Sequence, residues 1–244
     1  MTLGSVSRLE HSLGPIRPSL ASGTQALSLA EQIATQLAEA IINEEYAPGT
    51  RIHEIAVSEQ FQVSRGPVRE ALRILENAGL VSIQARRGAI VTNLSVEEVD
   101  DIFEIRAVLV GLAARRLARD FPPDNIGQIE ERIAELQELT KQADQDAARY
   151  VAISQELSFL LCAGTGSERL TSIVYSLFHQ TIRYTRIGLS TPERRQESAR
   201  TWAQLLEHIH SGNQAGAEMT ARQLVDNSRA MAIKMLRSEQ SRDS

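Results

Sequence analysis

The stretch 63–73, which reads VSRGPVREALR, most constrains what this chain can fold into. Three arginines recur there at intervals of four residues: Arg65, Arg69 and Arg73. On a helix they would form one stripe, while Val68, Leu72 and Leu75 would lie on the opposite side and could be buried. A short helix with one apolar face and one arginine face suits a DNA major groove, where arginine binds guanine or phosphate. Taken alone, three arginines would favour the plainer interpretation, a solvated arginine face on an ordinary surface helix.

The flanking segments favour the DNA-binding interpretation. Ser64 is a suitable N-cap for this helix, and Gly79 is a suitable stop after it. A shorter helical segment, 54–61, precedes it after the turn at 48–52, and two β-prone runs, 80–84 and 89–92, follow it. The tip between these runs carries Arg86, Arg87 and Gly88. Two helices followed by a basic hairpin predict a winged helix-turn-helix.

At this point the sequence strongly resembles the GntR family of bacterial transcription regulators. The residues that carry the resemblance are "PGTRI" at 48–52 and "VSRGPVREALRILENAGLVSIQARRGAIV" at 63–91. The resemblance implies DNA contacts from the second helix, from the preceding turn and from the wing. Together with the arginines singled out above, the predicted DNA-binding residues are Arg51, Ser64, Arg65, Gly66, Arg69, Arg73, Arg86, Arg87 and Gly88.

Charge and cysteine content limit the class of protein. The formal net charge is −5, so a nucleic-acid contact must come from local charge, and residues 62–92 hold five arginines against two glutamates. Cys162 is the only cysteine, which excludes an internal disulfide and fits a reducing cytoplasm. No apolar run approaches about 18 residues, and the first residues lack an apolar signal core. We therefore expect a cytoplasmic, nucleoid-associated protein without a membrane segment.

The chain beyond residue 93 reads as helix after helix. A capping box at 95–98 opens a helix to about residue 120, which Pro122 and Pro123 end. Further helices are expected at about 124–141, 146–162, 168–189, 192–211 and 213–237, with no comparable strand signal. The predicted fold is mainly α: a winged helix-turn-helix at 27–93, then an antiparallel all-α bundle at 94–237. Residues 1–26 are expected to form a flexible leader, and 238–244 a frayed tail.

The bundle resembles the FadR-type (FCD) ligand-sensing domain of GntR regulators. "LSVEEVDDIFEIRAVLVGLAARRLA" at 94–118, the break at 164–167 and "LLEHIHSGNQAGA" at 205–217 carry this resemblance, although Val110 stands where the subfamily usually has Glu. Many members hold a divalent cation with one Asp and three His. Alignment places those four positions on Ser154, Ser158, Trp202 and Leu224, none of which is a good metal ligand. We therefore expect no metal and no other cofactor.

Without a metal, the charge that holds an acidic ligand must come from arginine. The predicted ligand-binding residues are Arg106, Arg183 and Arg186, with Ser154, Ser158 and Trp202 at former metal positions. Each arginine has a plainer alternative, a surface or interhelical ion pair. A small organic acid is the expected effector, and a bulky acyl-type ligand is the alternative.

The sequence shows no pattern of a known enzyme class. P-loop, nucleotide-binding glycine, nucleophile-elbow and HExxH or CxxC patterns are absent. Cys162 and His179 could be imagined as a thiol–imidazole pair, but a lone cysteine in an apolar run is far more often a buried small hydrophobe. The expected function is a ligand-responsive, homodimeric repressor that binds a near-palindromic operator in double-stranded DNA. The alternative is a helical interaction protein without regulated DNA binding.

Overall fold

The computed structural model describes residues 27–84, 88–120, 123–142 and 146–241. The predicted leader, the wing-tip residues Arg86 and Arg87 and the last three residues of the predicted tail, 242–244, lie outside this part. Residues 238–240, which were predicted to belong to a frayed tail, are instead part of the last described helix. The chain divides into two compact units, Met1–Asn93 and Leu94–Ser244, and each is described by itself.

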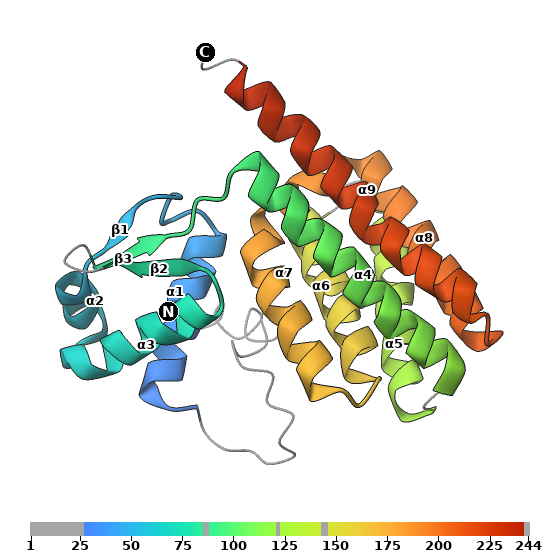
Figure 1. The fold of residues 1–244 in the computed structure, drawn as a ribbon, viewed down its shortest axis with the longest axis horizontal. Coiled ribbons are helices and arrows are strands. Elements are labelled where there is room, and N and C mark those ends of the chain that lie inside the picture. The colour runs from blue at the N-terminus through green and yellow to red at the C-terminus, as the bar shows by residue number, and fades with distance from the viewer. Residues whose placement is uncertain (1–26, 85–87, 121–122, 143–145, 242–244) are drawn as a thin grey trace. The chain divides into compact units, whose positions relative to one another are not determined.

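The described residues of the first unit form three helices and a small sheet (Figure 1). Its elements are α1 (Leu29–Ile42), β1 (Arg51–Ile52), α2 (Glu54–Phe61), α3 (Arg65–Asn77), β2 (Val81–Gln84) and β3 (Gly88–Val91). The strand order is β1-β3-β2, and both pairings are antiparallel. The winged helix-turn-helix prediction is confirmed, except that the turn at 48–52 contains a strand. Two residues are too few to show an alternating pattern, so β1 is recognisable only by its pairing with β3.

Local signals set the ends of these helices. A capping box opens α1: the Glu31 N–H donates to Ser28 Oγ at 3.2 Å, and the Ser28 N–H donates to Glu31 Oε2 at 2.9 Å. After α3, Gly79 takes a φ of 76°, and the Leu80 N–H donates to the Leu75 carbonyl at 3.0 Å. This left-handed turn ends the helix and sends the chain into β2.

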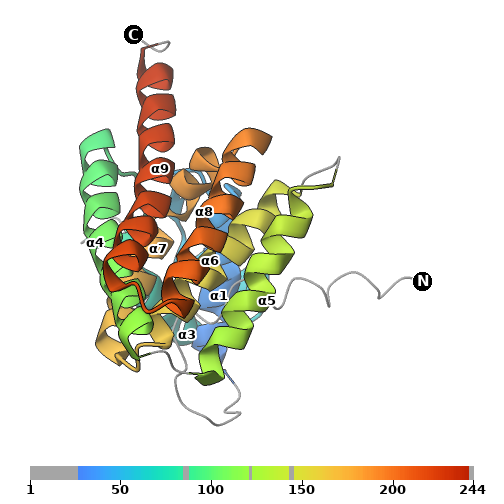
Figure 2. The same ribbon diagram turned by 90° about the vertical axis from the view of Figure 1, so that its right-hand side faces the viewer.

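The second unit is a bundle, and Figures 1 and 2 show its long helices running alongside one another. Its elements are α4 (Val96–Asp120), α5 (Pro123–Leu139), α6 (Ala147–Ala163), α7 (Glu168–Gly188), α8 (Pro192–His210) and α9 (Gln214–Gln240). The capping box that opens α4 is present, with Glu98 N–H donating to Ser95 Oγ at 3.1 Å. The part of this unit that the structure describes contains no strand, so the all-α prediction is confirmed.

The bundle core is formed by apolar stripes from all six helices, with Phe103, Leu136, Leu157 and Leu161 fully buried in it. At Gly188 the α7 backbone comes so close to α9 that an added Cβ would lie 2.6 Å from the Ser228 carbonyl oxygen. None of the described helices is long and apolar enough to cross a membrane.

Candidate nucleic-acid interface and buried arginine cluster

Helix α3 has one buried face and one exposed arginine face. Val68, Leu72 and Leu75 are between 0% and 2% exposed and pack in the core of the first unit. The arginines predicted to face DNA are all exposed: Arg65, Arg69 and Arg73. The helix therefore fixes its orientation through its apolar side and leaves three guanidinium groups free to reach outward.

The three arginines differ in how firmly they are held. Arg69 Nε lies 2.9 Å from Glu54 Oε2 on α2, and Arg73 Nη1 lies 3.7 Å from Glu70 Oε2 one turn earlier. Arg65 makes no ion pair with any residue that the structure describes. Both observed pairs are exposed, and such pairs stabilise a protein by less than about 1 kcal/mol. A nearby phosphate could compete with either glutamate.

The N-terminus of α3 is open. Ser64 occupies the N-cap position with extended backbone, but its side chain makes no capping hydrogen bond. This corrects the expectation that the hydroxyl caps the helix. The neighbouring Gly66 is exposed and has no Cβ, so a ligand can approach the first turn closely. Unsatisfied N–H groups and the helix dipole make such an end attractive to a phosphate oxygen.

The sheet brings Arg51 to the base of the wing. Arg51 on β1 pairs with Ile90 on β3. Its Nε lies 3.6 Å from where a Cβ would sit on Gly88, which has a φ of 78°. The positive φ favours glycine at this position, whereas an added Cβ would only make ordinary van der Waals contact with the Arg51 side chain. Arg51 and Gly88 were predicted as separate DNA contacts, and the structure places them next to each other.

In the second unit, Arg106 lies buried between α4 and α7. Only 4% of it is exposed. Its Nη1 donates to Thr181 Oγ1 at 2.6 Å and to Thr185 Oγ1 at 3.3 Å. The guanidinium carbon lies 4.3 Å from the Phe103 ring centroid and 5.2 Å from that of Phe178. These five residues form the arginine cluster.

The arginine cluster contains a positive charge without a negative partner. No carboxylate of the described residues pairs with Arg106, and its contacts are hydroxyls and ring faces. Burial lowers the pKa of its guanidinium to about 9, so the group still carries its charge at neutral pH. A buried cation of this kind attracts an anion strongly, because the surrounding medium screens the interaction little.

The other predicted ligand residues are spread over three helices. On α7, Arg183 lies two residues from each threonine of the arginine cluster, about 200° around the helix. Arg186 is half-buried. On α6, Ser158 Oγ donates to the Ser154 carbonyl at 3.0 Å, whereas Ser154 Oγ is buried without a hydrogen-bond partner. Trp202 on α8 is 3% exposed and belongs to the bundle core.

The residues at the former metal positions do not fit a divalent metal. Ser154, Ser158, Trp202 and Leu224 offer two neutral hydroxyls, an indole and an alkyl group, none of them a customary ligand. Within the described residues, no three His, Cys, Asp or Glu side chains are placed to hold a metal ion.

Three histidines of the bundle and Cys162 are explained by local contacts or by burial instead of by a metal site or a catalytic pair. His208 Nδ1 lies 3.1 Å from Asn213 Nδ2, and His210 pairs with Glu130 at 2.9 Å. Neither ring nitrogen of the buried His179 has a hydrogen-bond partner, so it does not pair with Cys162. Burial raises the pKa of Cys162 to about 12, which keeps the thiol protonated and unsuited to nucleophilic attack.

Sequence reasoning missed the threonines that hold Arg106. Phe178, Thr181 and Thr185 follow one another at spacings of three and four, so they share one face of α7. The spacing can be recognised in the sequence. Nothing in the sequence, however, indicates that this face of α7 contacts Arg106, which lies 75 residues before Thr181.

Comparison with known proteins identifies relatives of both units. The family model for bacterial regulatory proteins, gntR family, matches residues 29–91, and that for the FCD domain matches residues 101–227. The uncharacterized HTH-type transcriptional regulator YdhC of Bacillus subtilis is 28% identical over 188 residues, which cover 77% of this chain and 83% of YdhC. The HTH-type transcriptional repressor RspR of Escherichia coli K12 is 36% identical over 103 residues, covering 42% of this chain and 45% of RspR.

Among solved structures, E. coli McbR/YncC has a similar fold. The TM-score is 0.73 at 18% identity, and the match covers 86% of this chain and 100% of McbR/YncC. At this identity the likeness concerns the fold alone.

Proposed function

This chain belongs to the GntR family of bacterial regulatory proteins and carries an FCD domain, and from this premise we propose that it is a homodimeric transcriptional repressor controlled by a small organic acid. Membership makes it a transcriptional regulator whose first unit binds DNA. The proposal adds the direction of regulation, the subunit number and the effector. RspR, a relative of part of the chain, is named a repressor, which supports the direction.

The exposed arginine stripe of α3 is the observation that carries the DNA-binding proposal. We assign base recognition to Arg65, because the described residues offer it no competing carboxylate. Ser64, Gly66 and Arg69 would meet the backbone or neighbouring bases at the open helix end. Arg73 would contact phosphate. A two-fold dimer would present two such helices to the two halves of a near-palindromic operator.

The wing would supply further backbone contacts. Arg51 and Gly88 lie together at its base, which supports a phosphate contact there. Arg86 and Arg87, outside the described residues, remain proposed contacts of the tip. These contacts would position the protein without reading sequence, because phosphates are the same at every base pair.

The effector would bind inside the bundle, with its carboxylate on Arg106. The buried, unneutralised guanidinium of the arginine cluster supports an anionic ligand. Arg183, Arg186, Ser154, Ser158 and Trp202 remain proposed ligand contacts. Ligand binding would favour one arrangement of the bundles and so change the spacing of the two DNA-binding units.

Selection of DNA from a random pool tests the DNA-binding proposal and at the same time identifies the operator sequence. We expect wild-type protein to enrich an inverted repeat. On that sequence, Arg65→Ala should lose about 1–3 kcal/mol of binding free energy and accept changed bases at one position of each half-site. Arg73→Ala is the matched control, because it removes an arginine of the same stripe and should weaken binding to all sequences alike.

Gel shifts over a series of salt concentrations separate the two effects. Arg73→Ala should reduce the slope of log affinity against log salt by about one, since one phosphate contact is lost. If Arg65→Ala binds the selected sequence as tightly as wild type, the base-reading assignment is wrong. If wild-type protein enriches no sequence, the operator-binding proposal itself fails.

A further inference from the structure

The exposed apolar side chains of the helical unit gather on two neighbouring helices. Among its described residues, four large hydrophobic side chains are exposed, and three of them lie on α4 or α9: Ile105 at 51%, Val108 at 46% and Met219 at 68%. Helices α4 and α9 run side by side (Figure 1), linked by ion pairs such as Arg115 with Glu218 at 3.3 Å. An apolar surface of this kind normally marks an interaction site.

The outward face of α4 has the spacing of a helix-pairing seam. Its positions alternate in steps of four and three: Asp101, Ile105, Val108, Leu112, Arg115 and Arg119. All are exposed except Leu112, which is half-buried. This 3.5-residue period keeps one stripe facing a partner helix along its whole length. At 1.5 Å per residue, positions 101–119 form a seam about 27 Å long.

Charge along this face is divided between its two ends. The first turns expose Glu97, Glu98, Asp101 and Glu104, and the last turns carry Arg115, Arg116 and Arg119. The apolar residues lie between them. Two parallel copies would set acid against acid and arginine against arginine. Two antiparallel copies would set each acidic end against a basic end, which is the arrangement that a two-fold axis perpendicular to the helix produces.

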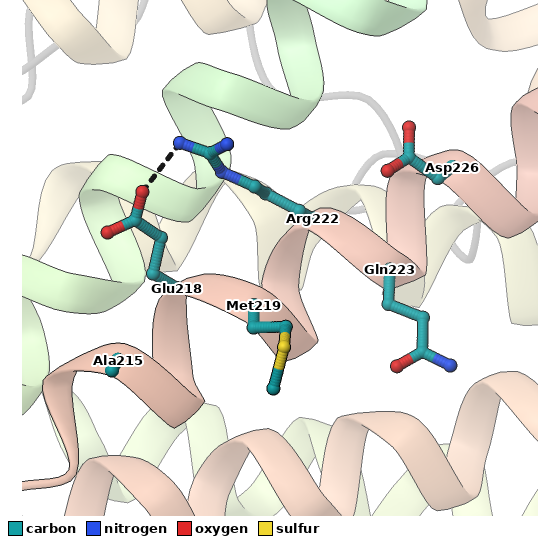
Figure 3. A pocket seen from close by; sticks show the side chains of 6 residues that line it. All are labelled: Ala215, Glu218, Met219, Arg222, Gln223 and Asp226. Atoms are coloured by element: carbon teal, nitrogen blue, oxygen red, sulfur yellow. Dashed lines mark hydrogen bonds and ion pairs between the residues drawn. The ribbon is translucent and has the colours of Figure 1, made fainter.

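The groove on α9 borders the same face. It is lined by Glu218, Met219, Arg222 and Asp226, among others, and Figure 3 shows Met219 extending from the helix there. Arg222 donates to Glu218 at 2.5 Å and packs over Gly111 of α4, where an added Cβ would lie 2.8 Å from Arg222 Cγ. Glu218 and Arg222 therefore lie at the boundary between α9 and α4, whereas Met219 points from α9 away from α4 in Figure 3.

We propose that the outward face of α4 is the dimer interface, in which it pairs antiparallel with α4 of a second copy of this chain. Charge selects the register: Asp101 faces Arg119 of the second copy, and Val108 faces Leu112. The pairs that Arg115 and Arg119 form within their own chain are exposed, so both guanidinium groups can also bind a second carboxylate. This inference rests on the homodimer of the proposed function and names its surface.

Sedimentation of the full-length protein tests the apolar part of the interface. Ile105→Arg/Val108→Arg should raise the dimer dissociation constant at least tenfold, because in the proposed register residue 105 faces Arg115 of the second copy and residue 108 faces Leu112. Ile173→Arg is the matched control, because Ile173 is 45% exposed on α7 of the same unit and should leave the dimer unchanged. Far-UV circular dichroism checks that each variant is folded.

A charge reversal tests the antiparallel register. Asp101→Arg should weaken the dimer, since it sets an arginine against Arg119 of the second copy. The double variant Asp101→Arg/Arg119→Asp should restore dimerisation toward the wild-type dissociation constant. If the double variant loses as much dimerisation free energy as Asp101→Arg and Arg119→Asp lose together when each is measured alone, the antiparallel register is wrong.

The outcomes distinguish this inference from the proposed function. If Ile105→Arg/Val108→Arg is as dimeric as wild type, the α4 interface is wrong and the face serves another contact, while the homodimer of the proposed function stands. A wild-type monomer at all concentrations overturns both. With the interface as proposed, the variant should still bind a single half-site while losing its tight binding to the inverted repeat.

Discussion

Replacing Arg106 with methionine should cost the unliganded protein little stability, although the residue is fully buried. The arginine cluster holds its guanidinium with two hydroxyls and two ring faces and no carboxylate. Methionine has a similar length and reach without the charge. The expectation differs from that for a buried ion pair, where loss of one partner costs about 3–5 kcal/mol.

The magnitude follows from the burial of the charge. A pKa of about 9 in place of 12.5 corresponds to a desolvation cost on the order of 5 kcal/mol. Two kinds of contact offset this cost. Hydrogen bonds from a charged donor stabilise by about 1.5–3 kcal/mol, and a desolvated cation–π contact stabilises by about 2 kcal/mol. Thr181 loses no essential partner, since its hydroxyl still donates to the Leu177 carbonyl at 2.9 Å. We expect Arg106→Met to lie within about 2 kcal/mol of wild type, on either side.

Arg195 is a matched control for this substitution. It is also 4% exposed, but its Nη1 donates to the carbonyls of Leu189 and Ser190, at 2.9 Å each, where α7 ends. Arg195→Met would leave the buried Leu189 carbonyl without this donor, at about 1–3 kcal/mol, whereas the part-buried Ser190 carbonyl can bond to water instead. Urea unfolding should therefore show a larger loss for Arg195→Met than for Arg106→Met. A loss of about 3 kcal/mol or more for Arg106→Met, the range of a broken buried ion pair, would refute the view that its charge is uncompensated.

The same pair of variants tests the effector proposal. Thermal unfolding against a panel of small mono- and dicarboxylates should reveal ligands that stabilise wild type, by about 2.7 kcal/mol at one hundred times the dissociation constant. Arg106→Met should lose this stabilisation. A carboxylate that stabilises both proteins equally would show that its charge is held elsewhere, and a response to acyl compounds alone would favour the bulky-ligand alternative.

Two further predictions concern the bundle. Burial lowers the pKa of His179 to about 4, whereas histidine in the unfolded chain titrates near 6.5. The unfolded chain therefore binds more protons between these values, and stability should be full above pH 6.5 and fall by about 3 kcal/mol on acidification to pH 4. Urea midpoints should show a shallower fall for His179→Phe, and an unchanged fall would contradict the assignment. Gly188→Ala should destabilise by at least about 1–3 kcal/mol, because the new Cβ meets α9 backbone at 2.6 Å. Gly127→Ala, in α5 with open space around it, should instead stabilise by about 0.5–1 kcal/mol, and equal effects in thermal unfolding would disprove the close helix contact.

The DNA-facing helix could be predicted because every signal for it is local. Arginines four residues apart must share a face once a helix forms, and Val68, Leu72 and Leu75 supply the reason for that face to point outward. The end of the helix was equally readable, since only glycine adopts the φ of 76° at residue 79 without strain. Most helix bounds in the second unit also followed from capping residues, prolines and glycines close in sequence.

Contacts between distant residues could not be predicted in this way. Strand β1 exists because Arg51 and Ile52 pair with Ile90 and Ala89 of β3. A segment of two residues is too short to carry a pattern that predicts this pairing. Arg69 meets Glu54 across the turn between α2 and α3, so the exposed stripe is less uniform than its spacing implies.

The arginine cluster shows most clearly which features could be predicted from the sequence and which only the tertiary structure decided. Family resemblance made Arg106 a candidate, with an ion pair as the alternative, and the linear chain offered no means to choose. Tertiary packing set it against two threonines and two phenylalanines rather than a carboxylate. Helical periodicity determines which residues share a face, because it depends on one backbone repeat. Which faces meet depends on how all six helices fill a common core, and that decided whether the charge of Arg106 was neutralised.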